Sequence, residues 1–386
     1  MQKRMLGLVV AVCMVFGFSQ SAGAASFKAG ETDLSLGGSV RLDSGWRFSD
    51  YGDAKLGTAE IDDKTDFFTE HPGNSRVFLK AVTGKMTGYV ELGIHSGVST
   101  RHAYAVYDLG AGNSLLVGHT WVPVSEDGPS QRLNYDDGLS YFGELSFVRG
   151  PQIRFEHSKD ELTCKLAVME ARTEFEDDHY QAEDVIPAIA ATLIYDDGKI
   201  NITPSLYAQR YELKALDNDG QYSDDATVTT YIVSLDASLK LDPLTLSGEV
   251  WYGQNASAAA DIVAGQLNAS FGMPAFDGDA TGQGLEDVNS YGGWVQLAMP
   301  INTGTFRVGA GYQSSEVEPS AEGYEDDMST WAAFINYEYP IYQSFTITPE
   351  IMYANYGKNP DKNAYGDGKN DLGTDLFVGV HFQYDF

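Results

Sequence analysis

Segments in which apolar and polar side chains alternate recur along most of this 386-residue chain. The last one, residues 375–386, is the clearest, with mostly polar residues on one face and Phe377 as the exception. Its apolar face carries Leu376, Val378, Val380, Phe382, Tyr384 and Phe386. A period of two indicates a β-strand, and about ten tilted residues span a bilayer core of roughly 25 Å.

Four further segments show the same alternation, and their polar faces contain charged residues. They are residues 231–241, 306–313, 331–339 and 345–353. Burying a charge at every second position would be costly in a soluble core. The pattern is natural when one face of a sheet meets lipid and the other meets water in a lumen, so it predicts an all-β transmembrane barrel.

The connections between these segments alternate in length. The short turns are Thr83–Met86, Gly110–Asn113, Ser158–Glu161, Asp196–Lys199, Leu241–Leu244, Met299–Gly304 and Tyr339–Ser344. The longer loops are Ser49–Pro72, Ser96–Thr100, Val122–Arg149, Thr173–Glu183, Lys214–Ala226, Asn255–Val288, Ser314–Met328 and Gly357–Asp371. Seven turns and eight loops predict an antiparallel barrel of about 16 strands, with short periplasmic turns and long extracellular loops.

Proline weakens some of these strand predictions. Pro187 falls within the segment Asp184–Tyr195, and the segment Asn74–Val82 alternates poorly. Pro204 and Pro349 also fall within predicted strands, where we expect bulges because proline lacks an N–H group.

Aromatic residues concentrate near the predicted strand ends. The chain has 23 Tyr, 19 Phe and 41 Gly, which favours strands and tight turns over helices. The candidates for a girdle at the membrane boundary are Trp46, Tyr104, Tyr107, Trp121, Tyr195, Tyr207, Tyr252, Tyr291, Tyr339 and Tyr353. The alternative is ordinary packing of these rings in a soluble β-sandwich.

The N-terminus has the organisation of an export signal. Lys3 and Arg4 precede the apolar run Leu6–Phe18, and Ala22-Gly23-Ala24 is a small-residue cleavage site. We therefore expect a signal peptide at 1–24 and a single barrel at 25–386. The expected mature chain keeps one cysteine, Cys164, which excludes an internal disulfide.

Together these features resemble the Gram-negative trimeric general porins. The resemblance rests on the signal peptide, the terminal Tyr384-Asp385-Phe386, the loop parity and the long loop after the fifth strand. The opening FKAGETDLSLGGSVRLDSGWRF is most similar to the outer-membrane homotrimeric porins of sulfate-reducing bacteria. The resemblance implies an outer-membrane homotrimer in contact with lipopolysaccharide, and passive diffusion of small hydrophilic solutes. It also implies that the barrel assembly machinery reads Phe386.

The loop at 122–149 is the candidate pore constriction. It reads VPVSEDGPSQRLNYDDGLSYFGELS and lacks the Pro-Glu-Phe-Gly-type motif of the family, so its inward folding is implied by position only. Its acids are Glu126, Asp127, Asp136, Asp137 and Glu144. Strand parity directs a set of bases towards the same lumen: Arg41, Arg76, Lys80, Arg154, Lys165 and Arg307. Opposed acids and bases would create a transverse field in the pore, and the alternative is that all are solvated positions without a role.

The charge balance narrows the partners. Against 25 Lys and Arg stand 55 Asp and Glu, a net charge of -30, which opposes nucleic-acid binding and favours cations in a pore. Much of the acid lies in predicted outer loops, where salt screens it within about 10 Å, so we expect mild cation selectivity. Adventitious Ca²⁺ could bridge these acidic outer loops, but no dedicated metal or cofactor site is expected.

Other functions find less support. The chain has no HExxH, GxSxG or P-loop motif, so we do not expect an enzyme. A substrate-specific channel and a plugged structural or adhesion barrel remain alternatives, although the inward aromatics Phe78, Trp251, Trp294 and Phe334 are scattered rather than continuous. By analogy with trimeric porins, a trimer interface is expected on the first and last strands, near the small residues Gly37, Gly38 and Gly93.

Overall fold

The structure is a computed structural model of the whole chain. It describes residues 24–53, 55–56, 59–60, 62–95, 97–133, 138–147, 149–172, 180–215, 226–261, 275–276, 285–316, 327–359 and 370–386. The expected signal peptide at 1–24 therefore lies almost entirely outside the described residues. No helix in the described part of the chain is long and apolar enough to cross a membrane.

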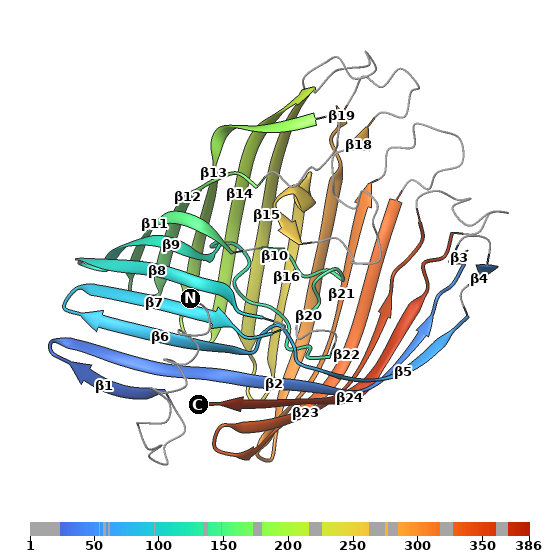
Figure 1. Cartoon of the computed structure of the whole chain (residues 1–386), viewed down its shortest axis with the longest axis horizontal. Helices are drawn as coiled ribbons and strands as arrows, with labels where there is room; N and C mark the ends of the chain where they lie inside the picture. Colours follow the sequence, from blue (N-terminus) through green and yellow to red (C-terminus); the bar gives the residue numbers. More distant parts are fainter. Residues whose placement is uncertain are drawn as a thin grey trace.

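Antiparallel strands form one closed barrel (Figure 1). The first half of its wall contains β1 (Ala25–Ala29), β2 (Thr32–Asp50), β5 (Lys64–Glu70), β6 (Arg76–Thr83), β7 (Met86–Gly93), β8 (Ser99–Gly110), β9 (Asn113–Trp121), β11 (Arg149–Lys159) and β12 (Leu162–Met169). The second half contains β13 (Tyr180–Asp196), β14 (Ile200–Ala215), β15 (Ala226–Lys240), β16 (Thr245–Gln254), β20 (Asn289–Ile301), β21 (Gly304–Glu316), β22 (Asp327–Tyr342), β23 (Phe345–Asn355) and β24 (Thr374–Asp385).

The first long strand, β2, closes the barrel. Its residues 39–50 pair with β24 on one edge, and its residues 32–36 pair with β1 beyond the end of β24. Its other edge pairs with β5 over residues 43–49 and with β6 over residues 33–39. Because β5 and β6 share one position in the wall and β1 and β24 share another, the 18 strands form a closed circuit of 16 strand positions, as the loop parity predicts.

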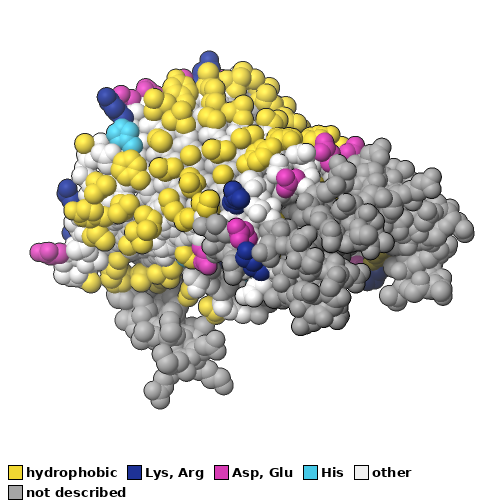
Figure 2. All heavy atoms as spheres, turned by 90° about the horizontal axis from the view of Figure 1, so that it is seen from above, with side chains coloured by type: hydrophobic (Ala, Val, Ile, Leu, Met, Phe, Trp, Pro, Cys, Tyr) yellow, Lys and Arg dark blue, Asp and Glu magenta, His cyan; other side chains and the backbone are white. Residues whose placement is uncertain are grey.

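The outer face of the barrel is apolar. Figure 2 shows one side of the molecule on which hydrophobic side chains cover most of the described surface, with charged side chains scattered towards the edges. Leu42, Val117, Leu166, Val233 and Ile351 are each at least 40% exposed on this face. Such exposure would be a liability in water and is natural for a wall that meets lipid.

The short turns occur where the sequence predicts them, but the first loop is shorter than predicted. Lys64–Glu70, expected within the loop Ser49–Pro72, is instead a strand paired with β2. Phe67 lies on the outer face, where its ring centroid is 5.3 Å from that of Trp46. Phe68 points inward and packs against Phe377, which explains the apolar exception on the inner face of β24. The adjacent pair Phe67-Phe68 interrupts the alternation and hid this strand.

The prolines behave differently from one another. Near Pro187 the pairing of β13 with β14 shifts its register twice, as expected for bulges. Pro204 and Pro349, in contrast, sit opposite Leu235 and Val380 without any register shift. The expectation of bulges at these two positions is therefore wrong, since the ladder tolerates a missing N–H group without inserting a residue.

The wall is lower on the side from β6 to β12 than on the side from β13 to β22. We call these sides the low wall and the tall wall. β6, β7 and β12 have 8 residues each, whereas β13, β14 and β22 have 17, 16 and 16. The contrast between the two sides is visible in Figure 1. Most predicted girdle residues, such as Trp46 and Tyr291, are exposed on the outer face. Tyr104 and Tyr207 were assigned wrongly, because both point inward; Tyr207 is only 2% exposed and packs against Phe147.

Candidate functional site

The segment between β9 and β11 is named the inner loop, and its described residues, 122–133 and 138–147, lie inside the barrel. It contains the short strand β10 (Ser146–Phe147). Its apolar side chains are almost completely buried, with Leu133 and Leu139 at 0% and Phe142 at 1% exposure. They form one apolar cluster with the wall residues Trp251 and Trp294. Burial of this apolar surface holds the loop against the wall from the inside.

A buried carboxylate on β23 anchors the middle of the inner loop. Glu350, 2% exposed, accepts hydrogen bonds from the backbone N–H groups of Arg132 at 2.9 Å and Leu133 at 2.7 Å. The amides of Gln131 and Asn336 also donate to it, both at 2.8 Å. Hydrogen bonds to a charged acceptor are stronger than neutral ones, so this contact fixes the loop to the wall.

A second set of contacts anchors the end of the loop to the tall wall. Glu249 on β16 accepts from the Leu145 N–H at 3.2 Å and from the Trp294 indole at 2.9 Å. The Tyr141 carbonyl accepts from Gln313 at 2.7 Å and from Thr330 at 2.5 Å. The close approach is possible because the neighbouring Gly311 lacks a side chain; a Cβ atom there would lie 2.2 Å from the Phe142 carbonyl oxygen.

The loop does not fill the lumen. A polar cavity of about 690 Å³ remains between it and the low wall. Arg101, His119 and Trp121 line it from β8 and β9, and Arg132, Glu144 and Arg149 line it from the inner loop and the start of β11. A space bounded by charged groups on both sides suits hydrated ions and small polar solutes.

All six predicted wall bases lie on the inner side of the barrel, and three of them pair with wall acids rather than loop acids. Arg76 is 3.7 Å from Glu91, Arg154 is 2.7 Å from Glu156, and Arg307 is 3.2 Å from Glu338. Arg41 is buried and donates to Ser39 at 3.1 Å, and Lys80 is exposed.

Lys165, another of the predicted bases, forms an ion pair with Glu126 and so joins the wall to the inner loop. Among the described residues, this pair joins one predicted wall base to one predicted loop acid. The assignment of the six bases to the pore remains a prediction.

The predicted loop acids have different surroundings. Glu126 and Asp127 are exposed, whereas Glu144 accepts from the Leu139 N–H at 2.6 Å and braces the loop internally. The pKa of Asp127 is raised, first because the enclosing barrel partly removes it from bulk water and second because Glu126 carries a like charge. Asp136 and Asp137 lie outside the described residues.

The arginines and the loop acids Glu126 and Asp127 lie beside different parts of the wall. Arg76, Arg101, Arg149 and Arg154 belong to the wall from β6 to β11. Glu126 and Asp127 lie near Lys165 of β12, and their charges act on Asp236 of β15. The arginines share their part of the wall with Glu91 and Glu156, and a field across the pore remains a prediction.

Several site residues were not singled out from the sequence. Glu91 on β7 binds Arg101 at 2.8 Å and accepts from the Tyr89 hydroxyl at 2.7 Å, which makes it the centre of the arginine-rich wall. Glu249 and Glu350 anchor the inner loop. In the sequence, each of these residues is an acid at a position whose side chain is expected to point into the barrel. The alternation does not show which of the inward-pointing acids lie beneath a loop.

Aromatic rings form a row on the inner side of the low wall. Phe78 and Tyr89 are stacked with centroids 5.7 Å apart, and Tyr104 follows at 5.3 Å from Tyr89. Phe78 was grouped with Trp251, Trp294 and Phe334 as scattered inward aromatics. Those three are 2–5% exposed within the apolar cluster, so Phe78 alone of the four belongs to this row.

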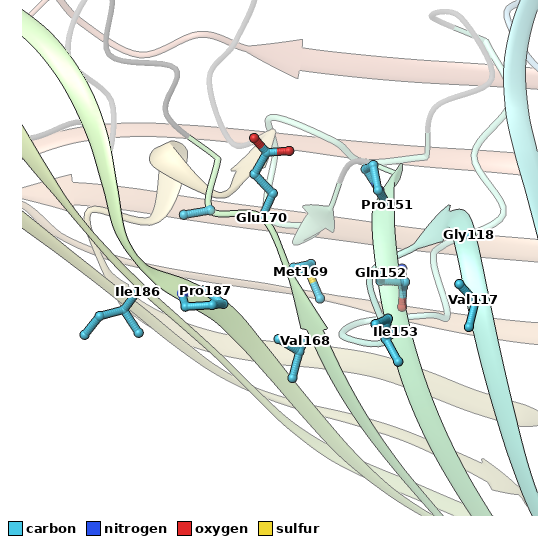
Figure 3. Close-up of a pocket in the computed structure, with 11 residues that line it drawn as sticks. Val117, Gly118, Pro151, Gln152, Ile153, Val168, Met169, Glu170, Ile186 and Pro187 are labelled. Atoms are coloured by element: carbon cyan, nitrogen blue, oxygen red, sulfur yellow. The ribbon is translucent and has the colours of Figure 1, made fainter.

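A second hollow of about 550 Å³ lies where β13 separates from β12 near Pro187 (Figure 3). It is lined mainly by outward-facing apolar side chains such as Val117, Ile153, Val168 and Ile186. Figure 3 shows Glu170 pointing away from these side chains. This hollow carries no polar cluster and is not the candidate site.

Several solved structures share this architecture. No protein-family profile and no curated protein sequence matches the chain. The outer membrane channel DcaP of Acinetobacter baumannii superposes with a TM-score of 0.69 at 17% identity, over 94% of this chain and 100% of that one. The fold is that of a porin barrel. An anion-selective porin from Comamonas acidovorans matches with a TM-score of 0.59 at 12% identity, over 92% of this chain and 100% of that one.

A third solved structure shares the fold. The trimer form of OmpT, an outer membrane protein of Vibrio cholerae, matches with a TM-score of 0.58 at 13% identity. The match covers 92% of this chain and 100% of that one. At these identities the likeness establishes the fold, and the function must be argued from the site.

Proposed function

We propose that this protein is an outer-membrane porin through which small hydrophilic solutes and ions diffuse passively. The observation that carries the proposal is the polar cavity that remains beside the inner loop. A loop that narrows a lumen without closing it, and that is held by buried hydrogen bonds, suits a permanently open filter. The apolar outer face supports a position in the membrane.

We further propose a mild preference for cations. The net charge of -30 raises the concentration of cations near the pore mouth. The arginines that line the polar cavity oppose this effect, which is why the preference is mild rather than strict. The acids Glu126 and Asp127 are the lumen groups that would attract the cation.

Planar-bilayer recording of the purified protein under a KCl gradient tests both statements. Stable open conductance with a reversal potential that slightly favours K⁺ is expected. Folded protein that conducts no current would refute the open pore and favour a plugged structural barrel. A reversal potential that favours Cl⁻ would refute only the cation preference and would show that the arginines dominate.

We propose a homotrimer that associates through the low wall. Ala81, Gly88 and Ala105 are opposite one another on the outer face of β6, β7 and β8, and a Cβ atom added to Gly88 meets nothing within 4 Å. A flat strip of small residues allows close approach of another barrel. The earlier candidates Gly37, Gly38 and Gly93 are less suitable, because atoms of this chain already fill the space beside them.

A substrate-specific channel is a second candidate, favoured by the aromatic row. Phe78, Tyr89 and Tyr104 lie beside Arg76 and the Glu91–Arg101 pair, so a planar solute with an acidic group could contact both rings and guanidinium groups. Replacing Tyr104 with Ala should then slow uptake of an aromatic carboxylate while KCl conductance changes little. Equal uptake by both proteins would leave general diffusion as the function.

A further inference from the structure

Two carboxylates face each other beneath the inner loop without a positive partner. Asp236 on β15 and Glu249 on β16 are directly opposite in the antiparallel ladder and are 3% and 2% exposed. Neither forms an ion pair with any Lys, Arg or His among the described residues. Two buried like charges at this spacing are relieved either by protonation or by a compensating positive charge.

Neighbouring acids add to the negative charge at this position. The charges of Glu126 and Asp127 act on Asp236, and that of Glu144 acts on Glu249. Lys165, whose charge acts on Asp127, is itself paired with Glu126.

Several oxygen atoms here have no hydrogen-bond partner. Both Asp236 carboxylate oxygens and Glu249 Oε1 are buried and unpartnered. The hydroxyl of Ser234 is also unpartnered; it lies two residues from Asp236 on the same inner face and is 7% exposed. The Ser125 hydroxyl, from the inner loop, lies within hydrogen-bonding reach of Glu249. One shared proton would join only two of these atoms, whereas a metal ion contacts several at once.

We propose that Asp236 and Glu249 bind a hard cation of the Ca²⁺ class, together with neighbouring hydroxyl oxygens. A donor set made only of oxygen is the set that such ions prefer. No group of three or more His, Cys, Asp or Glu in the described residues is placed to hold a metal, so hydroxyls, backbone carbonyls and water complete the shell. This site is separate from the acidic outer loops.

The cation would fasten the inner loop to the tall wall. Glu249 Oε2 already accepts from the Leu145 N–H and the Trp294 indole, which leaves Oε1 for the ion. The ion then neutralises the Glu249 carboxylate, which accepts the hydrogen bond from the loop. Its removal should loosen the loop at the Leu145 end while Glu350 still holds the middle.

Terbium luminescence on the folded, detergent-purified full chain tests the site, because Tb³⁺ replaces Ca²⁺ and Trp294 lies 2.9 Å from Glu249. After chelation, Tb³⁺ should give saturable emission on tryptophan excitation, and Ca²⁺ should displace it. Asp236→Asn and Glu249→Gln should each weaken this binding roughly tenfold or more, since affinity follows ligand charge. Glu338→Gln, which changes an acid of the wall paired with Arg307, serves as the matched control and should leave it unchanged.

Emission that persists in both variants would place the ion elsewhere and overturn the proposal. A second measurement keeps the test valid if a variant folds poorly. In the wild-type protein, Ca²⁺ should raise the thermal unfolding midpoint. An unfolding midpoint that ignores Ca²⁺ but rises as the pH falls would indicate a shared proton between the two acids and would also overturn the proposal.

Discussion

Glu350 is the residue on which the position of the inner loop depends most directly. It accepts from two backbone N–H groups and two side-chain amides in a buried setting. Glu350→Ala would leave these donors unpartnered and should lower the free energy of unfolding by roughly 2–3 kcal/mol. Urea unfolding in detergent measures the loss.

The same substitution should also change the pore. With the middle of the loop released, single-channel conductance should rise and become noisier than in the wild type. Glu350→Gln keeps most of the acceptor geometry and provides the matched control, with a smaller effect on both measurements. A conductance identical to wild type in Glu350→Ala would mean that the apolar cluster and the contacts at Glu249 and Tyr141 position the loop without Glu350.

Asp127 gives the pore a pH dependence. Its pKa is raised by the enclosing barrel and by the charge of Glu126, so on acidification it is protonated earlier than an ordinary Asp. The preference for K⁺ should therefore begin to fall at a pH above the usual Asp range, as the charge is lost. Reversal potentials measured from neutral to acidic pH test this, and Asp127→Asn should flatten the early part of the curve.

At the level of strands, Pro204 tests how much one ladder hydrogen bond contributes. Its side chain is exposed on the outer face of β14, and its pairing with β15 is in register. Pro204→Val restores an N–H group without changing the apolar surface, and should stabilise the barrel by about 0.5–1.5 kcal/mol. Unfolding in urea measures this, and a loss of stability would show that the strand needs the proline angle.

The alternating pattern sufficed to predict most strands, because each strand has one face towards an apolar outside and one towards a polar lumen. It failed at Lys64–Glu70, where the adjacent residues Phe67 and Phe68 place an apolar ring on each face. Two apolar residues in a row interrupt the alternation of apolar and polar residues along the sequence. It also misassigned Tyr207, since an inward ring beneath the inner loop has the same sequence signature as an outward ring at the membrane boundary.

The candidate site was predictable only in part. Strand parity correctly placed Arg154 and Lys165 on the inner side, as a period of two requires. It did not reveal that Glu249 and Glu350 are covered while Glu126 remains open to the lumen. Which acids are covered depends on the path of the inner loop through space, and that path is set by contacts between residues more than 100 positions apart.

For the whole molecule, the low wall provides the test of assembly. Gly88→Trp would place a large ring on the strip formed with Ala81 and Ala105, and should convert the expected trimer to monomers. Ala237→Trp, on the outer face of the tall wall, is the matched control and should leave the trimer intact. Electrophoresis of unheated samples or light scattering distinguishes the two. Trimers in both variants would place the interface elsewhere.

The closure of β2 on β24 has a consequence for biogenesis. The Asp43–His381 contact at 2.6 Å joins residues 338 positions apart, and twelve residue pairs follow the same seam. Because the partner of the first long strand is made last, the nascent sheet keeps two open edges until synthesis ends. Such edges recruit other chains, so the unfinished protein depends on holding factors in transit. A chain that stops before Thr374 should accumulate as aggregates or be degraded, however sound its other strands are.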